Sequence, residues 1–203
     1  MRTVNSSFYL SNPPVVLNEK FTTGTIGTVT VRTLEQADII QAANVIGDSF
    51  QIGAAFGRWL MPLFKLGIRE DLHSRWREQD PQRAVALVAT INRSTSKIVG
   101  TIEVTNRGTL YHASLAKRYA YIANLAVDDG YRSLGIGRQL INQCESIASQ
   151  WGFGYIYLHV MAENPAANHL YTKMGFEVLC SDQTWHLLPW KRSSRLFLRK
   201  ALA

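Results

Sequence analysis

The stretch YIANLAVDDGYRSLGIGRQLINQCESIASQW, from Tyr121 to Trp151, decides the fold. Its first seven residues, up to Val127, are mostly apolar and predict a β-strand, and a glycine-containing turn follows. After the turn, apolar residues recur at spacings of one, three and four, which fits one face of an α-helix: Leu140, Ile141, Cys144, Ile147, Ala148 and Trp151. Gly152 and Gly154 predict the end of this helix.

The turn from Arg132 to Gly137 has the chemistry of an anion-binding site. Backbone amides at a helix N-terminus have no intrahelical partners, and the helix dipole adds partial positive charge there. Gly135 and Gly137 would allow a ligand close to the backbone, and Arg132 adds a positive charge. A purely structural turn fits the same Arg-x-x-Gly-x-Gly pattern. A dinucleotide fingerprint is disfavoured, because Leu140 occupies the position of its third glycine.

A second motif, NPAANHLYTKMGF, runs from Asn164 to Phe176. Asn164 and Pro165 are a typical helix start, and Gly175 predicts the helix end. In order and spacing, the two motifs together resemble the GNAT superfamily of acetyl-CoA-dependent N-acetyltransferases. The close resemblance covers residues 119–178, under a third of the chain.

The resemblance implies the fold of the whole chain. We expect an α/β (α+β) protein with a central mixed, mostly antiparallel sheet of six to seven strands, flanked by about four helices. Its fourth and fifth strands, at 119–127 and 155–160, should splay apart. A bulge in the fourth strand should leave one N–H for the thioester oxygen. Residues 1–27 are expected to be an extended or flexible arm, and residues 28–203 a single domain.

Acetyl-CoA is the co-substrate that the resemblance implies. The turn would hold its pyrophosphate, and the end of the preceding strand would pair with its pantetheine amides. The implied contact residues are Leu125, Ala126, Val127, Arg132, Ser133, Leu134, Gly135, Ile136, Gly137, Arg138, Asn164, Asn168 and Tyr171. A helix cap is an adequate alternative role for Asn164. No cluster of Cys and His has the spacing of metal ligands, so no metal is predicted.

Two residues resemble the proton-handling pair of the protein N-terminal acetyltransferases: Tyr121 and His159. The segments Asn124–Val127 and Leu158–Val160 also resemble the plastid and cyanobacterial GNATs, some of which acetylate both protein N-termini and lysines. Tyr171 resembles the superfamily tyrosine that binds the sulfur and acts as general acid. For the histidine and for Tyr171, a role as an ordinary core residue is the alternative.

The acceptor sets how strong a base the site needs. At pH 7, deprotonating an α-amine of pKa about 8 costs about 1.4 kcal/mol, and deprotonating a lysine of pKa about 10.4 costs about 4.6 kcal/mol. A histidine, acting directly or through water, therefore suffices for an α-amine. Glu103 is an alternative base, since some GNAT enzymes use a carboxylate from a neighbouring strand.

Hydrophobic patterns predict the remaining elements. Strands are expected at 28–32, 83–91, 98–104, 176–179 and 195–201. One helix is expected at 35–50. Residues 56–76 are rich in large apolar side chains. The resemblance makes this segment a wall of the acceptor groove, and ordinary packing on the sheet is the alternative. Cys144 and Cys180 are expected to be small core residues.

Composition excludes several classes of protein. With 46% hydrophobic and 18% charged residues, the chain is globular, and no apolar run reaches the length of a membrane span. The net charge is +7, but the basic residues are spread along the chain, so nucleic acid is an unlikely partner. A basic face also suits the phosphates of coenzyme A and acidic peptides.

We therefore expect an N-acetyltransferase that moves an acetyl group from acetyl-CoA directly to a primary amine in a ternary complex. Protein N-terminal α-amines are the expected acceptors, with lysine side chains second. A small-molecule amine acetyltransferase and a non-catalytic acyl-CoA-binding module are the alternatives. We expect a monomer or homodimer in the cytoplasm, with the plastid stroma as the alternative location.

Overall fold

The computed structural model describes residues 18–23, 27–49, 65–74, 83–92, 96–108, 118–185 and 192–202. The strands are β1 (Asn18–Thr23), β2 (Gly27–Thr33), β3 (Ala84–Asn92), β4 (Ser96–Gly108), β5 (Arg118–Val127), β6 (Tyr155–Met161), β7 (Glu177–Trp185) and β8 (Arg192–Ala201). The helices are α1 (Ile39–Ser49), α3 (Ile136–Gln150) and α4 (Pro165–Lys173), with the short 3-10 helices η1 (Gln36–Asp38) and η2 (Asp129–Tyr131). Residues 65–74 are also helical.

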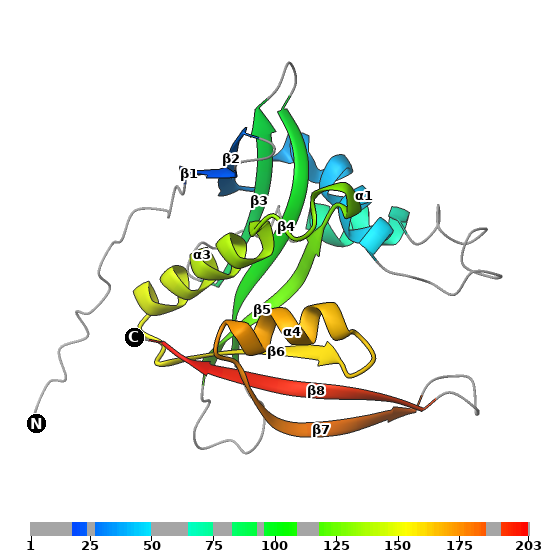
Figure 1. Ribbon diagram of the computed structural model, residues 1–203, viewed down its shortest axis with the longest axis vertical. Helices are drawn as coiled ribbons and strands as arrows, with labels where there is room; N and C mark the ends of the chain where they lie inside the picture. Colours follow the sequence, from blue (N-terminus) through cyan, green and yellow to red (C-terminus); the bar gives the residue numbers. More distant parts are fainter. Residues whose placement is uncertain are drawn as a thin grey trace, which may run out of the picture.

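All eight strands form one sheet in the order β1-β2-β3-β4-β5-β6-β8-β7 (Figure 1). Every neighbouring pair is antiparallel except β5 and β6, which are parallel. The expected α/β fold with a mixed, mostly antiparallel sheet is therefore confirmed. The sheet has one strand more than the six to seven expected, because residues 18–23, assigned to the arm, form β1. Its Phe21 packs on the core, and its backbone pairs with β2.

The helices cover both faces of the sheet. One core lies between the sheet and α3 and includes Leu87, and α3 and α4 lie over the same face (Figure 1). A second core joins α1 and the helical segment 65–74 to Val88. Because neighbouring strand residues point to opposite faces, Leu87 and Val88 place these two cores on opposite sides. The expected apolar face of α3 is buried as predicted, at Leu140, Ile141, Cys144, Ile147 and Ala148.

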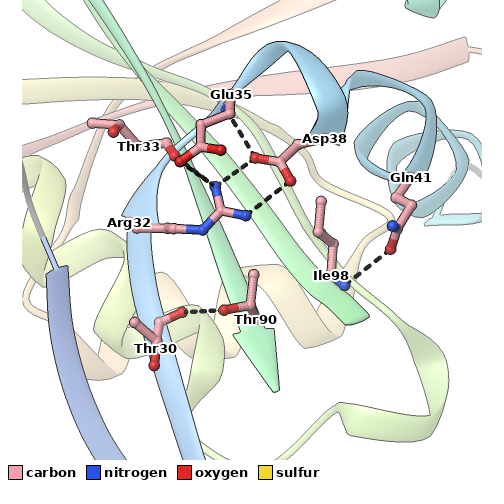
Figure 2. Close-up of polar contacts among 8 residues, drawn as sticks. All are labelled: Thr30, Arg32, Thr33, Glu35, Asp38, Gln41, Thr90 and Ile98. Carbon is pink, nitrogen blue, oxygen red and sulfur yellow. Dashed lines mark hydrogen bonds and ion pairs between the residues drawn. The ribbon is translucent and has the colours of Figure 1, made fainter. Parts of the chain in front are cut away.

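Helix α1 is attached to the sheet by polar contacts at its start (Figure 2). The guanidinium of Arg32, on β2, binds both carboxylate oxygens of Asp38, and Glu35 N–H donates to the same carboxylate over 2.8 Å. Further along the helix, the side-chain oxygen of Gln41 accepts a hydrogen bond from Ile98 N–H on β4 over 3.3 Å. These contacts fix α1 against β2 and β4, on the face of the sheet opposite α3.

Two expectations need correction or lie outside the described residues. Cys144 is buried in α3 as expected, but Cys180 is exposed, because β7 is the last strand at the edge of the sheet. Of the apolar segment 56–76, only residues 65–74 are described; Leu72 is buried there, and Leu66 is half exposed. Within the described part, none of the helices combines the length and apolarity that a bilayer span requires.

Candidate active site

Strands β5 and β6 separate soon after they meet. Both lie entirely within the described range 118–185, and their pairing consists of Ala120 with Ile156 and Tyr121 with Tyr157. Beyond Tyr121, β5 continues along β4 only, while β6 continues along β8. The expected splay is therefore confirmed, and the backbone of residues 122–127 faces an opening in the sheet.

Tyr121 and His159 meet across this opening. The Tyr121 hydroxyl lies 2.9 Å from Nδ1 of His159, so the two side chains expected to handle protons share a hydrogen bond. The imidazole also stacks on Phe197 of β8, with ring centroids 4.6 Å apart. Tyr121 is buried, whereas His159 is partly exposed. The pair is therefore held rigidly, with one member accessible from outside.

A positive charge lies directly on the tyrosine of this pair. The guanidinium carbon of Arg107 is 3.6 Å from the centre of the Tyr121 ring. Its Nε donates to Thr105 Oγ1 over 3.2 Å, and that hydroxyl donates to the Tyr121 carbonyl over 3.3 Å. Arg107 is thus oriented at two points, and its charge lies on the face of the sheet that carries the Tyr121 and His159 side chains.

The expected bulge in β5 is present. Two residues of β5, Asn124 and Leu125, oppose the single residue Ile102 of β4. Asn124 has a left-handed backbone with φ of 54°, a conformation that Asn tolerates better than most residues. Of the expected pantetheine contacts, Leu125 and Val127 are partly buried against the α3 core, whereas Ala126 is buried in the α1 core.

The turn after β5 is held by side chains of its own and of β4. Asp128 accepts from Gly130 N–H over 3.0 Å and pairs with Lys97 of β4 at 2.9 Å. Burial opposes ionisation of Asp128, but the hydrogen bonds from Lys97 and Gly130 N–H and the positive charges of Lys97 and Arg132 together outweigh it and keep the pKa of this carboxyl below its usual value. Arg132 donates from Nε to the Val127 carbonyl over 3.3 Å and pairs with Asp129 at 2.6 Å. The charge of the Arg132 guanidinium is therefore partly neutralised by Asp129, and its orientation is fixed by the Val127 carbonyl.

The N-terminus of α3 presents unpaired amides as expected. The first helical hydrogen bond of α3 runs from Gln139 N–H to the Gly135 carbonyl, so the amides of residues 136–138 point out of the helix end. Ser133 and Gly135 have positive φ values of 62° and 81°, and a Cβ on Gly135 would meet nothing within 4 Å. Of the other expected residues in the turn, Ser133 and Arg138 are exposed and Leu134 is partly buried. The Ile136 side chain is in the core, which leaves only its backbone for a ligand.

Two glycines set how closely α3 packs. A Cβ on Gly137 would lie 3.2 Å from Leu170 of α4, so this glycine lets α4 pack closely against α3, and its contact with a ligand stays a prediction. On β4, a Cβ on Gly100 would lie 3.1 Å from both Ile136 and Leu140 of α3. Gly100 therefore allows the start of α3 to rest on the sheet beside the opening.

Helix α4 contributes Tyr171. Its side chain is 6% exposed and contacts Phe176 edge-on, with ring centroids 5.5 Å apart. Burial, with smaller contributions from Tyr121 and Cys144, raises the pKa of the Tyr171 hydroxyl well above its usual value. A phenol is protonated at neutral pH even without this shift, and burial extends its protonated range to more alkaline pH.

The two asparagines of the second motif shape the start of α4. Asn164 caps the helix by accepting from Ala167 N–H over 3.1 Å. The amide nitrogen of Asn168 donates to the carbonyls of Met161 and Ala162, both over 3.1 Å. Both residues thus have a structural role at the end of β6, and their contact with a co-substrate stays a prediction.

Comparison with known proteins agrees with this geometry. The model of the acetyltransferase (GNAT) family matches residues 54–176. The chain belongs to this family. The expected membership is therefore confirmed, and with it the expectation of an acetyltransferase.

Relatives of this GNAT protein include plant and animal acetyltransferases. GCN5-related N-acetyltransferase 10, chloroplastic, from Arabidopsis thaliana is 25% identical over 175 residues, which are 82% of this chain and 68% of that protein. N-alpha-acetyltransferase 50 from Danio rerio is 37% identical over 76 residues, which are 37% of this chain and 45% of that protein. Among solved structures, Arabidopsis thaliana NAA60 in complex with a bisubstrate analogue is 18% identical, with a TM-score of 0.62 over 86% of this chain and 99% of that one. At this identity the structural match shows the fold alone.

Several residues of this GNAT site escaped the sequence analysis. They are Lys97, Gly100, Arg107 and Phe197, all on strands β4 and β8. Each acts on the site through a contact with another strand or helix. No local pattern marks such residues, so only the pairing of the strands identifies them.

Proposed function

We propose that this GNAT protein transfers an acetyl group from acetyl-CoA directly to a primary amine in a ternary complex. Protein N-terminal α-amines are the main acceptors, and lysine side chains are a second class. The hydrogen bond between Tyr121 and His159, at the opening between β5 and β6, carries this proposal. It places a potential base beside the part of the sheet where a thioester can lie.

The described residues fit acetyl-CoA as co-substrate. The amides of residues 136–138 and the open Gly135 would hold the pyrophosphate, with Arg132 beside them. The β5 backbone beyond Tyr121 would pair with the pantetheine amides, as one more strand would. When bound, acetyl-CoA supplies the activated acetyl group. Tyr171, a phenol that is protonated at neutral pH, would protonate the departing sulfur.

Tyr121 and His159 would remove the proton of the acceptor amine. Their hydrogen bond allows a proton to pass between the phenol oxygen and Nδ1 in either direction, depending on the tautomer of the imidazole. At pH 7, deprotonation costs about 1.4 kcal/mol for an α-amine and about 4.6 kcal/mol for a lysine side chain. This difference favours α-amines over lysines as acceptors of a histidine-based site.

Two further observations support a polypeptide acceptor. One relative is named N-alpha-acetyltransferase 50, and a solved protein of the same fold was captured with a bisubstrate analogue. In addition, Arg107 holds a positive charge on the Tyr121 ring, which suits acceptors with acidic residues close behind the reacting amine. The chloroplastic relative favours the plastid stroma over the cytoplasm as the location.

The test offers acetyl-CoA together with three acceptor classes at equal concentration. These are a peptide library with free N-termini, the same library with blocked N-termini, and polyamines with amino acids. Mass spectrometry then locates each acetyl group. We expect acetylation of free N-termini, with weaker modification of lysines. Acetylation of the small amines alone would replace this proposal with a small-molecule acetyltransferase, and no transfer to any class would leave only acyl-CoA binding.

A further inference from the structure

Two side chains of β4 bind one residue of the β5 bulge, Asn124. One binds its backbone carbonyl and the other binds its side chain. Thr101 Oγ1 donates to the Asn124 carbonyl over 3.0 Å. The side-chain amide of Asn124 donates in turn to Glu103 Oε2, also over 3.0 Å. Thr101 and Glu103 are 3% and 4% exposed, so both hydrogen bonds lie away from bulk water, where they are strongest.

These contacts stabilise a backbone conformation that would otherwise be unfavourable. Asn124 has φ of 54°, which costs most non-glycine residues about 1 kcal/mol or more. Its carbonyl and its side chain are each tied to β4, so the strand cannot relax into a regular ladder. The bulge is therefore an over-determined feature of the sheet and not a loose irregularity.

The direction of the next amide follows from the planarity of the peptide bond. The Asn124 carbonyl and the Leu125 N–H belong to one trans peptide unit, so they point in opposite directions. Because the carbonyl points to Thr101 on β4, the Leu125 N–H points away from Thr101. β5 lies between β4 and the opening toward β6, so this N–H is directed to the side where the sheet is open.

The resemblance already implies that an N–H of this bulge binds the thioester oxygen. We infer that Thr101, Asn124 and Glu103 form a clamp that fixes the Leu125 N–H in position for that role. In this clamp Glu103 is a positioning residue that accepts from Asn124, and it is not the base. The inference rests on the proposed function only in assuming that an acyl-CoA occupies the opening. It does not depend on which amine is acetylated.

A binding measurement tests the clamp without any acceptor. Calorimetry compares the affinities of the full chain for acetyl-CoA and for CoA, which lacks the acyl oxygen. We expect the wild type to prefer acetyl-CoA and Thr101→Val to lose most of that preference, while its affinity for CoA stays within about threefold. Thr101→Ser, which keeps the hydroxyl, should restore the preference. Equal preference in the wild type and in Thr101→Val would overturn the clamp.

Kinetics of Glu103 separate positioning from base catalysis. Glu103→Gln keeps a carbonyl oxygen for the Asn124 amide, so we expect kcat within about threefold of wild type and an unchanged pH profile. Glu103→Leu removes the acceptor and should lower kcat at least tenfold, with the KM for acetyl-CoA changed much less. If Glu103→Gln loses turnover as fully as Glu103→Leu, Glu103 is the base and the inference fails. If the wild type binds acetyl-CoA but acetylates no amine, the proposed function fails while the binding test still decides the clamp.

Discussion

The hydroxyl of Tyr121 and the imidazole of His159 are joined over 2.9 Å from two parallel strands that have just ceased to pair. This hydrogen bond spans the start of the opening in the sheet. Phe197 stacks on the imidazole and Arg107 lies on the phenol, so each ring is held by one further side chain. A proton relay needs such fixed rings, because proton transfer is sensitive to small errors in distance.

Replacing the imidazole should abolish most turnover and leave co-substrate binding intact. We expect His159→Phe to lower kcat by about 10²- to 10⁴-fold, the usual contribution of a general base, with an unchanged Kd for acetyl-CoA. Steady-state kinetics and calorimetry measure the two quantities. Tyr157→Phe is the matched control: it removes a hydroxyl from the neighbouring ring, which stacks on the same Phe197, and should retain activity. A fully active His159→Phe would remove His159 from the mechanism.

The buried phenol of Tyr171 predicts an alkaline dependence of stability. Because burial raises its pKa in the folded protein, the unfolded chain loses this proton first as the pH rises. Folding is therefore unaffected by this group below about pH 10 and is weakened above it. We expect Tyr171→Phe to lose stability less steeply between about pH 9 and pH 11 and to lower kcat at neutral pH. Thermal denaturation across this range checks the first effect, and parallel slopes for the two proteins would contradict it.

The contact between Arg32 and Asp38 should stabilise the fold at neutral pH and not at acid pH. Burial opposes ionisation of Asp38, but hydrogen bonds from Arg32 and Glu35 N–H outweigh it and lower the pKa of the carboxyl. Its contribution is therefore present above the usual carboxyl pKa and is lost as the pH falls below about 4. We expect Asp38→Asn to lower the free energy of unfolding by about 1–3 kcal/mol at pH 7, with a smaller difference at pH 3.

The matched control for Asp38 lies three residues earlier. Glu35 is 3.8 Å from the same guanidinium, but its side chain is 69% exposed. Such surface pairs contribute little, so Glu35→Gln should change stability by less than about 0.5 kcal/mol. Urea denaturation of both variants at two pH values makes the comparison. If Glu35→Gln lowered the free energy of unfolding as much as Asp38→Asn does, burial of the Arg32–Asp38 contact would not explain its contribution to stability.

Local patterns were sufficient for the parts of the site that are continuous in sequence. The Arg132–Gly137 turn, the apolar face of α3 and the cap at Asn164 all follow rules that act within a few residues. The clamp could not be predicted in this way. Thr101 and Glu103 lie 23 and 21 positions from Asn124, and only the register of β4 against β5 brings them together. The sequence analysis offered Glu103 as an alternative base on the resemblance alone, because its contact with Asn124 was not visible in the sequence.

The edges of the sheet were also harder to predict than its centre. The β1 segment NEKFTT has a single large apolar residue, Phe21, and this is too weak a pattern to distinguish a strand from an extended arm. At β7 the strand itself was predicted, but the expectation that Cys180 is a core residue was wrong, because Cys180 is exposed like its apolar neighbours Val178 and Leu179. An edge strand has a neighbour on one side only, so hydrophobicity is a poorer guide to its burial.

The close packing of α3 on β4 predicts an effect on co-substrate binding. In Gly100→Ala the new methyl would lie 3.1 Å from Ile136 and Leu140, so the N-terminus of α3 must move by a few tenths of an ångström. We expect a loss of about 1–3 kcal/mol in unfolding free energy and a higher KM for acetyl-CoA, with kcat at saturation changed less. Gly108→Ala is the control on the same strand, since nothing lies within 4 Å of its Cβ. An unchanged KM in Gly100→Ala would show that the turn tolerates this displacement.

The charge of Arg107 predicts a preference among acceptor peptides. Its guanidinium carbon lies 3.6 Å from the centre of the Tyr121 ring, beside the position proposed for deprotonation of the acceptor amine. Peptides with the same first residue followed by Glu or Gln should therefore differ in kcat/KM, with the acidic peptide better by roughly three- to tenfold at low salt. Arg107→Ala should remove most of this preference, and added salt should weaken it in the wild type.

A second arginine supplies the control for Arg107. Arg118 begins β5 and alternates with Tyr119 and Tyr121, so its side chain belongs to the opposite face of the sheet. Arg118→Ala changes the net charge by the same amount and should leave the ratio of the two peptides unchanged. If both variants reduced the ratio equally, the overall field of the protein would explain the preference. If Arg107 acts by local contact, only Arg107→Ala should reduce the ratio. The field of a distant surface charge is screened within about one Debye length, so Arg118→Ala should have no effect.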